Sequence, residues 1–336
     1  MATLKDVAKE TGLATGTVSR VLNNRGYISD EARKKVDDAM KKLNYQPNEV
    51  ARSLHSKSSN TIGLIVPHIR HPYFSGMISN LENEANKRGY KILLCNSQST
   101  DEKEQEYLNM CTGNQVAGII LCSGSISVEI FNSANIPIIT MERFLDNGTA
   151  SVECDNAHGG ELAAEKLISC GCRNLLHVGA ISSIAMPADK RSEGFRKVCE
   201  REGVSVIELM TEDAQYYDLA YNDLIEEALL KYPETDGVFA SSDVIAAQTL
   251  QICRKLHILV PEQMKVIGFD DVLMASLTTP QLTTIHQPVK EMAEIALNLL
   301  DDAVAGKLVP KRTVLPVRLV ERESTGERIA HIYEIP

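Results

Sequence analysis

The chain has 336 residues, which is enough for about two domains, each with a core of its own. Its 45 acidic and 35 basic residues give a net charge of −10, and an acidic chain taken as a whole argues against a nucleic-acid binder. The charge is uneven, because residues 1–57 hold 11 basic and 7 acidic residues, a net charge of +4, whereas the remainder carries −14, so the basic segment is where we look for a nucleic-acid site.

Three short helices are predicted in the first part of the chain. The first begins at Leu4, behind the capping residue Thr3, and ends near Gly12. The second covers about 15–22, and the third follows the capping residue Ser29. Two short helices joined by a turn that contains glycine are typical of the helix-turn-helix unit, which places its second helix in the major groove of DNA.

The outer face of the second helix carries the side chains that would meet DNA. Away from its apolar face lie Thr15, Gly16, Ser19 and Arg20. Hydroxyl groups suit phosphates and base edges, and an arginine suits guanine or phosphate. The spacing therefore favours DNA binding over the alternative, a plain helical hairpin with a solvated face.

From Thr61 onward, apolar segments of strand length alternate with amphipathic helices. The expected strands are Ile62–Val66, Lys91–Cys95, Gly118–Cys122, Pro137–Met141, Leu175–Val178, Val206–Leu209, Gly237–Ala240 and Val266–Phe269. The expected helices include Gly76–Lys87, His158–Ile168, Arg191–Glu202, Leu219–Leu230 and Val244–Leu256. Buried strands between helices indicate parallel sheets with helices on both faces, in which ligands bind at the carboxyl ends of the strands. Since about 275 residues is long for one such sheet, two lobes are expected.

We expect neither a membrane segment nor a metal site. Met1 to Asp6 lacks the apolar core of a signal peptide, and the longest apolar runs, such as Ala117–Cys122, are far shorter than the roughly 20 residues of a membrane helix. Among the eight cysteines, the close pair Cys170 and Cys172 has no second pair to complete a zinc site. These features predict a cytoplasmic protein with reduced thiols and no cofactor.

Several segments resemble the lactose-repressor (LacI-type) family of bacterial transcription regulators. In the first part of the chain they are Asp6-Val7-Ala8, Gly12, Thr17 to Asn23, Leu43 to Asn48 and Ala51 to Leu54. In the rest they are Ile267 to Asp271 and Pro280 to Ile285, so the resemblance covers nearly the whole chain. It implies a small all-α helix-turn-helix head and an α/β two-lobed body similar to periplasmic sugar-binding proteins, with parallel sheets flanked by helices.

The resemblance also implies domain boundaries. The parts would be a helix-turn-helix DNA-binding domain at 1–47, a hinge helix and linker at 48–60, and an effector-binding and dimerisation domain at 61–336. The lobes of that last domain would hold about 61–156 with 288–319, and about 157–287 with 320–336, and three strands would join them.

The family's DNA-contacting positions can be placed on this sequence. Thr15, Gly16 and Arg20 would read bases, and further contacts of the head, mostly to phosphates, would come from Thr3, Leu4, Thr17, Ser19 and Asn23. In the hinge, the operator contacts would come from Asn48, Ala51, Arg52 and Leu54, with Leu54 wedged between base steps in the minor groove. The sequence departs from the family at Ala14, where a Ser or Thr cap is usual, and at Gly16, which has no side chain to read a base.

The implied effector site lies in the cleft of the body. The candidate residues are His71, Tyr73, Phe74, Glu142, Arg143, Arg191, Ser242, Asp243, Asp270 and Gln287. Carboxylates and an arginine bind vicinal hydroxyl groups by charge-assisted hydrogen bonds. For Arg191 and Asp270 the alternative is an ion pair between the lobes, and for Tyr73 and Phe74 it is core packing. The carboxylates Glu142 and Asp270 argue against a polyanionic effector.

Together these features predict a sequence-specific repressor that binds a palindromic operator as a homodimer and releases it when a small sugar occupies the body. Stretches such as Asn114 to Ile120 and Leu282 to Pro288 look like sucrose-operon repressors of Gram-positive bacteria, so sucrose or a related sugar is the first candidate. One alternative is a corepressed regulator of the catabolite-control type, which depends on a phosphorylated carrier protein. Another is a transport-type sugar-binding protein, against which the head argues. No Gly-x-Gly-x-x-Gly motif after a strand, P-loop or Gly-x-Ser-x-Gly motif points to an enzyme.

Overall fold

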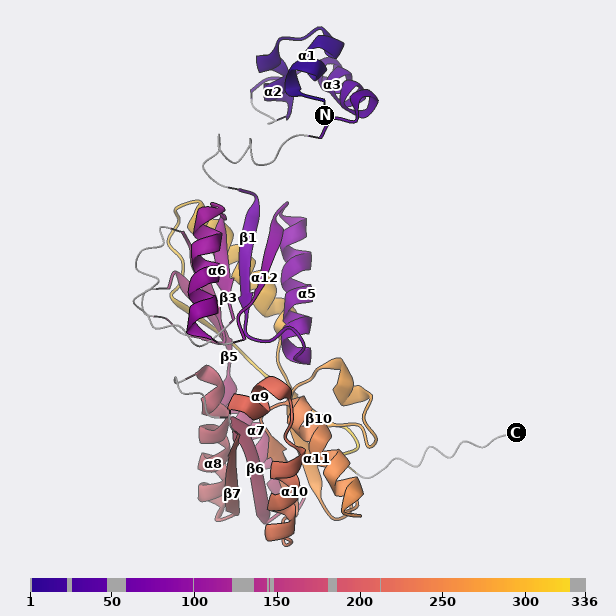
Figure 1. The fold of residues 1–336 in the computed structure, drawn as a ribbon. Helices are drawn as coiled ribbons and strands as arrows, with labels where there is room; N and C mark the ends of the chain where they lie inside the picture. The colour runs from indigo at the N-terminus through magenta and orange to yellow at the C-terminus, as the bar shows by residue number, and fades with distance from the viewer. Residues whose placement is uncertain are drawn as a thin grey trace, which may run out of the picture. The chain divides into compact units, whose positions relative to one another are not determined.

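The computed structural model describes residues 2–22, 26–46, 59–98, 100–122, 136–143, 145, 148–180, 186–211 and 213–326. The chain forms two compact units, Met1–Ser59 and Asn60–Pro336, termed the head and the body (Figure 1). Among the described residues, no helix has both the length and the apolar character that crossing a membrane requires.

The head is a bundle of three short helices, α1 (Leu4–Thr11), α2 (Thr15–Leu22) and α3 (Asp30–Leu43). These helices and both predicted caps are confirmed, because the Thr3 hydroxyl accepts from the amide of Asp6 at 3.4 Å and the Ser29 hydroxyl accepts from the amide of Ala32 at 3.3 Å. The small core consists of Val7, Ala8, Val18, Val21, Val36 and Ala39. All three helices contribute to it, so the buried face of α2 is held against its neighbours and the opposite face is left to solvent.

Two sheets form the body, one in each of two lobes. The sheet of the first lobe has the order β11-β5-β4-β3-β1-β2 and contains β1 (Thr61–Val66), β2 (Lys91–Asn96), β3 (Gly118–Leu121), β4 (Ile138–Met141), β5 (Ala150–Cys154) and β11 (Arg312–Leu315). The sheet of the second lobe has the order β12-β10-β9-β8-β6-β7 and contains β6 (Asn174–Ala180), β7 (Ser205–Thr211), β8 (Gly237–Ala240), β9 (Lys265–Asp270), β10 (Thr283–His286) and β12 (Arg318–Val320). The pairings are parallel, apart from the antiparallel pairing of β10 with β12.

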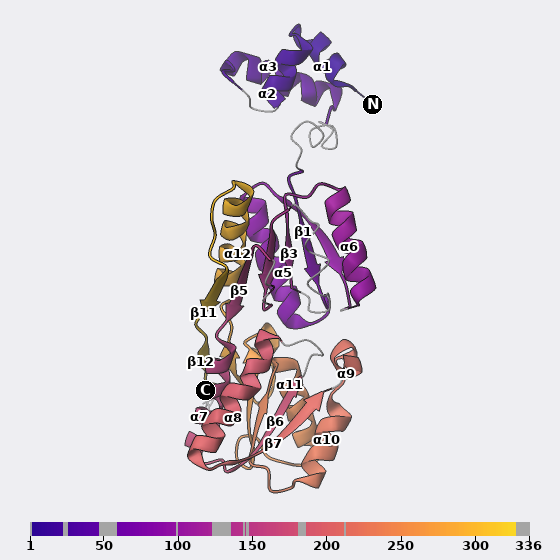
Figure 2. The same ribbon diagram turned by 90° about the vertical axis from the view of Figure 1, so that its left-hand side faces the viewer.

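Helices cover both faces of each sheet (Figure 2). In the first lobe, one face carries α5 (Pro72–Lys87) and α12 (Val289–Val304), which pack together, and the other carries α6 (Asp101–Gly113). In the second lobe, one face carries α7 (Asn156–Ser169) and α8 (Lys190–Glu202), and the other carries α10 (Asn222–Lys231) and α11 (Asp243–Lys255). The buried strands are nearly continuous apolar runs because helices remove both faces of the sheet from water.

The eight expected strands are confirmed, with ends shifted by at most two residues, but β5, β10, β11 and β12 were not predicted. Their apolar runs are short and interrupted by polar or charged residues, so hydrophobic patterning does not reveal them. In β5, Glu153 is 2% exposed and pairs with Arg312 of the neighbouring β11. A buried carboxylate is tolerated there because its partner lies across the strand pair, which the sequence does not reveal.

The chain passes between the lobes three times. β5 leads into α7, β10 leads into α12, and β11 leads into β12. Since the strands of each sheet are mostly parallel, side chains at their carboxyl ends gather beside these crossings. A ligand held there would touch both lobes and the segments that connect them.

Candidate functional site

Arg191, the second residue of α8, lies at the centre of a buried polar cluster in the body. Its Nε donates to Oδ1 of Asn156 at 2.7 Å, and its Nη1 donates to the carbonyl oxygen of Ser241 at 2.7 Å. Nη1 also lies 3.8 Å from Oδ1 of Asp270, and the guanidinium carbon lies 3.7 Å from the centre of the Phe269 ring. The guanidinium is therefore held in one orientation before any ligand binds, which reduces the entropy lost on binding.

Glycines place Arg191 by letting the backbones of α7 and α8 touch. A Cβ atom at Gly160 would lie 2.0 Å from the carbonyl oxygen of Arg191, and one at Gly194 would lie 1.9 Å from the carbonyl oxygen of Ala157. No side chain fits at either position unless a whole helix moves. This close approach brings Arg191 of α8 within reach of Asn156 at the start of α7.

We expect the substitution Gly160→Ala to lower the free energy of unfolding by about 1–3 kcal/mol, because its methyl group meets a helix backbone rather than a flexible side chain. Gly76→Ala is the matched control, since Gly76 lies within α5 and a Cβ there would have no atom within 4 Å. The control is expected to be neutral or to gain up to about 1 kcal/mol from helix propensity. Urea unfolding measures both, and equal unfolding free energies for the two variants would contradict the expectation.

Asp270 ends β9 and faces Arg191. Its Oδ1 accepts from Nε2 of Gln287 at 2.7 Å, and the residue is 5% exposed. Burial raises the pKa of Asp270 to about 7, while Arg191 and the hydrogen bond from Gln287 act to lower it. The backbone of Asp270 has a φ of +115°, which an L residue rarely adopts and which aims its carboxylate into the cluster.

Glu142 follows β4 and also lies in the cluster. Its Oε1 accepts from the amide of Cys154 at 2.6 Å, and its Oε2 accepts from Nδ2 of Asn156 at 2.8 Å. Burial raises the pKa of Glu142, whereas the charge of Arg191 and these hydrogen bonds act to lower it. The amide of Asn156 thus touches Glu142 with its nitrogen and Arg191 with its oxygen.

Aromatic and histidine rings surround the start of α5. Nδ1 of His71 accepts from the amide of Tyr73 at 3.3 Å and so caps the helix. The ring centre of Phe74 lies 5.7 Å from that of His71, and Tyr216 of α9 (Asp213–Asp218) lies 6.2 Å from the rings of both His71 and His68. Burial lowers the pKa of His71 to about 4, with smaller effects from His68 and Arg191, so His71 is neutral at pH 7, as an accepting cap must be.

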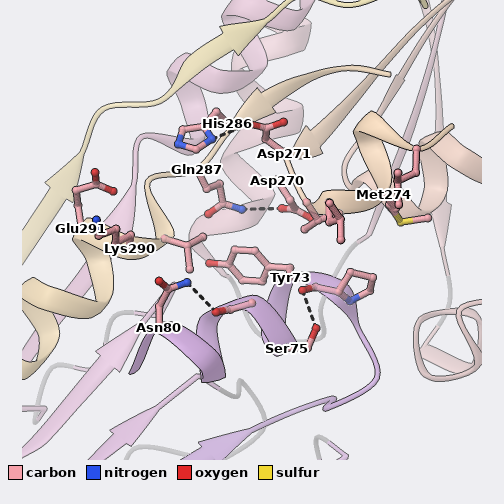
Figure 3. Close-up of a pocket in the computed structure, with 16 residues that line it drawn as sticks. Tyr73, Ser75, Asn80, Asp270, Asp271, Met274, His286, Gln287, Lys290 and Glu291 are labelled. Atoms are coloured by element: carbon pink, nitrogen blue, oxygen red, sulfur yellow. Dashed lines mark hydrogen bonds and ion pairs between the residues drawn. The ribbon is translucent and has the colours of Figure 1, made fainter. Parts of the chain in front are cut away.

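A pocket with a volume of about 790 Å³ opens between the start of α5 and the segments that follow β9 and β10 (Figure 3). Its lining includes Tyr73, Asn80, Asp270, His286, Gln287 and Lys290. Two buried polar atoms of this lining have no hydrogen-bond partner among the described residues: Oη of Tyr73 and Oε1 of Gln287. One can donate and the other can accept, so the hydroxyl groups of a ligand would satisfy both.

Three other predicted effector contacts, Ser242, Asp243 and Arg143, interact with groups outside the cluster. Ser242 caps α11 by accepting from the amide of Ile245. Asp243 is fully buried, and its carboxylate accepts from the Thr284 hydroxyl at 2.5 Å and from the amide of Val272 at 2.8 Å. Burial lowers the pKa of the Arg143 guanidinium, whereas the negative charges of Glu104 and Asp101 in α6 raise it.

Patterning misses four residues of the cluster: Asn156, Phe269, Tyr216 and His68. Asn156 lies two residues after β5, and because β5 is not evident from hydrophobic patterning, its carboxyl end is not evident either. Phe269 is the last residue of the predicted strand Val266–Phe269 and is not among the predicted site residues, although its ring lies under Arg191. The pair Tyr216-Tyr217 after β7 is a signal that could have been found, because aromatic residues after a strand end are unusual in a polar segment.

In the head, the described DNA-contact candidates divide by exposure. Thr15, Gly16 and Arg20 are exposed on α2, whereas Thr17 and Ser19 are half-buried. In α1, Leu4 is half-buried against the core, and the Thr3 hydroxyl also donates to Oδ2 of Asp6 at 2.7 Å. The remaining candidates lie outside the described residues, and they are Asn23, Asn48, Ala51, Arg52 and Leu54.

Ala14 precedes α2 where a capping side chain is usual. Its carbonyl oxygen accepts from the amides of Thr17 at 2.8 Å and Val18 at 3.1 Å, so it begins the helix through its backbone. Its methyl group has no oxygen to accept from the first amides of α2. Those amides point out of the helix start, where they can meet phosphate oxygens.

Two family models match the chain. The model of the bacterial regulatory proteins of the lacI family matches residues 3–48, and that of the periplasmic binding protein-like domain matches residues 164–325. The first match coincides with the three-helix head, and the second covers most of the second lobe together with α12 and β11 of the first lobe.

Relatives match over nearly the full length. The chain is 37% identical over 324 residues to the sucrose operon repressor of Streptococcus mutans, covering 96% of this chain and 99% of that one. It is 35% identical over 327 residues to the ribose operon repressor of Halalkalibacterium halodurans, covering 97% of each. A solved structure of a periplasmic binding protein/LacI transcriptional regulator from Alkaliphilus metalliredigens, complexed with D-xylulofuranose, is 30% identical with a TM-score of 0.72 and covers 80% of this chain and 100% of that chain.

Proposed function

Since the chain belongs to the lacI family of bacterial regulatory proteins, we propose that it is a transcriptional repressor that binds operator DNA through its head and a small sugar through its body. The main evidence for sugar binding is the cluster around Arg191, where a guanidinium held in one orientation lies near the carboxylates of Asp270 and Glu142. Beside it, the unpartnered Tyr73 Oη and Gln287 Oε1 match the donor and acceptor character of hydroxyl groups.

The charges of this cluster favour a neutral sugar over a phosphorylated one. Two buried carboxylates, Asp270 and Glu142, accompany the single guanidinium of Arg191. A phosphate group would add negative charge to a cluster that already carries excess acid. Among neutral sugars, sucrose or a related sugar is our first candidate, because sucrose, ribose and D-xylulofuranose are named for the similar proteins.

For this sugar we propose contacts from the side chains that converge on the cluster. Arg191 and Asp270 would bind vicinal hydroxyl groups, because a guanidinium and a carboxylate form charge-assisted hydrogen bonds with them. His71, Tyr73 and Phe74 would cover an apolar face of the sugar, and Gln287 and Glu142 would complete the polar contacts. Because these residues come from both lobes, binding depends on how the lobes are arranged.

For the operator we propose that the exposed face of α2 enters the major groove, with Arg20 reading a base and Thr17 and Ser19 holding phosphates. The chain would act in the cytoplasm as a homodimer, because two heads match a palindromic site. The sugar would favour the arrangement of the body that binds operator poorly, which makes operator release a two-state coupling.

A panel of sugars tests this function. An operator duplex is first selected from a random DNA pool with the full chain. Sucrose, ribose, fructose and their phosphates are then added, and melting temperature and operator affinity by fluorescence anisotropy are measured together. A neutral sugar should raise the melting temperature and weaken operator binding. Tightened operator binding with a sugar phosphate or with a phosphorylated carrier protein would instead indicate a corepressed regulator.

Sugar affinity is expected to weaken as the pH falls from 8 to 6. Burial raises the pKa of Asp270 to about 7, and its ionised form is the stronger acceptor for hydroxyl groups, so protonation removes the binding form at low pH. The decrease should approach roughly tenfold per pH unit well below that pKa. His71, with a pKa lowered to about 4, stays neutral throughout. Calorimetry on Asp270→Asn should give weaker binding with a shallower dependence on pH, and a slope unchanged from the parent chain would exclude Asp270 as its source.

A further inference from the structure

On the basis of the function proposed above, we propose that Asn156 is the positioning residue that couples the sugar cluster to the junction of the two lobes. It is the first residue of α7 and lies directly after the chain leaves the sheet of the first lobe through β5. It is 2% exposed, so its hydrogen bonds compete little with water. Its place in the chain is the first of the three crossings between the lobes.

Asn156 uses both ends of its side-chain amide, one toward each lobe. Its Oδ1 accepts from Nε of Arg191 in the second lobe at 2.7 Å. Its Nδ2 donates to Oε2 of Glu142 in the first lobe at 2.8 Å and to the carbonyl oxygen of Cys154 at 3.2 Å. Glu142 is in turn fixed to the end of β5 by the amide of Cys154. A movement of the Arg191 guanidinium is therefore transmitted through one amide to the first lobe.

An amide is the side chain that this place requires. It must accept from a guanidinium, which has only donors, and donate to a carboxylate, which has only acceptors when ionised. An aspartate would turn a second carboxylate toward Glu142, and an apolar residue would leave both Glu142 and the guanidinium Nε short of a partner in a buried place. We call the hydrogen bonds from Arg191 to Asn156 and from Asn156 to Glu142 the bridge, and the chemistry of these groups fixes the direction of donation in both.

Asn156 and Arg191 lie on a rigid pair of helices, and the residues that they contact have strained backbones. α7 and α8 touch through their backbones at Gly160 and Gly194, so Asn156 and Arg191 sit on a rigid helix pair. The backbone φ angles of Glu142 and Asp270, on either side of that pair, are +52° and +115°. Such conformations are unfavourable for residues other than glycine and persist where the surrounding structure enforces them. On the other side of Arg191, Asp270 is bonded to Gln287, at the second crossing.

An exchange of amide and carboxylate tests the bridge. In Asn156→Asp, two carboxylates face each other, and the ratio of operator affinities without and with saturating sugar is expected to fall at least about tenfold. In the double variant Glu142→Gln/Asn156→Asp, the amide introduced at 142 donates to the carboxylate introduced at 156. The hydrogen bonds to Arg191 and to residue 142 are thereby re-formed, and only the bond from Asn156 to the carbonyl oxygen of Cys154 is lost. The ratio should therefore return toward that of the parent chain, giving a coupling term in the double-mutant cycle.

Asn222→Asp is the matched control, because Asn222 is also the first residue of its helix, α10, and is exposed. It should respond to sugar like the parent chain. Operator binding without sugar should stay within about threefold in every variant, since the head is unchanged. Melting temperature shows whether each variant is folded, and calorimetry measures sugar binding separately from operator release.

The outcomes separate this proposal from the function on which it depends. If the parent chain binds no sugar of the panel, the proposed function fails, and the coupling role fails with it. If the parent chain binds sugar and releases operator, but Asn156→Asp does so equally well, only the coupling role of Asn156 is wrong. A folded, sugar-binding double variant that does not regain the response would overturn the bridge in the same way.

Discussion

Arg191→Ala is expected to leave operator binding nearly unchanged and to remove its response to sugar. Removing the guanidinium takes away the donors for the sugar and leaves Asp270 and Glu142 without their positive neighbour. Truncating one partner of a buried, hydrogen-bonded charge pair costs about 2–5 kcal/mol, which corresponds to a loss of sugar affinity of roughly 30-fold to several-thousandfold. Calorimetry with the sugar and anisotropy with the operator measure the two functions separately.

Two further variants serve as controls for this experiment. Arg196→Ala removes the same charge from the same helix at an exposed ion pair with Glu208, and it should respond to sugar normally. Arg191→Lys keeps the charge but not the planar fork that donates to Asn156 and Ser241, so weakened binding is expected again. If Arg191→Lys is folded and releases operator at the same sugar concentration as the parent chain, the cluster is not the sugar site.

Arg20→Ala is expected to remove most of the preference for the operator over unrelated DNA. Arg20 is exposed on α2, and its Nε lies 3.5 Å from the carbonyl oxygen of Gly16, so the side chain lies along the outer face of the helix. A base contact of this kind contributes about 1–3 kcal/mol of discrimination, or roughly 5- to 150-fold in affinity for the operator. Binding to a scrambled duplex should change much less.

The comparison between the two duplexes decides what Arg20 does. A contact to phosphate would weaken both duplexes equally and reduce the salt dependence of binding by about one ion. The matched control is Arg201→Ala, which removes the same charge from an exposed position on α8 in the body. Unchanged discrimination in Arg20→Ala, measured by anisotropy at several salt concentrations, would exclude Arg20 from base reading.

The fold of the head could be predicted almost entirely from the sequence, because its determinants are local. Thr3 and Ser29 cap helices within three residues of themselves, and Gly12 ends α1 in the left-handed conformation with a φ of +70°. Apolar residues at helical spacing supply the core. In the body, the strands flanked by helices on both faces were predicted for the same reason, since burial on both sides leaves an uninterrupted apolar run.

At the candidate site, sequence patterns do not show which of the predicted residues contact one another. The sequence placed Arg191 and Asp270 at strand ends and helix starts, but it treated Ser242 and Asp243 in the same way. In the structure, Arg191 and Asp270 face each other, whereas Asp243 is bonded to Thr284 and Val272. Asp270 is the last residue of β9 and Asp243 comes three residues after β8, so both lie near the carboxyl end of a strand, and only the neighbours that each contacts in the structure distinguish them.

The sequence by itself determined the basic three-helix head, the doubly covered parallel sheets and the chemical character of the body's polar residues. Each of these depends on residues close together in the chain, through caps, apolar periodicity and charge. Only the tertiary structure decided that Asn156 joins Glu142 to Arg191, that Glu153 in β5 pairs with Arg312 in β11, and that Tyr73 and Gln287 have polar atoms left for a ligand. The hydrogen bonds and the ion pair join residues between 14 and 159 positions apart in the chain. The polar atoms of Tyr73 and Gln287 lack a partner among the described residues. Both features result from strand order and helix packing, which local sequence patterns do not reveal.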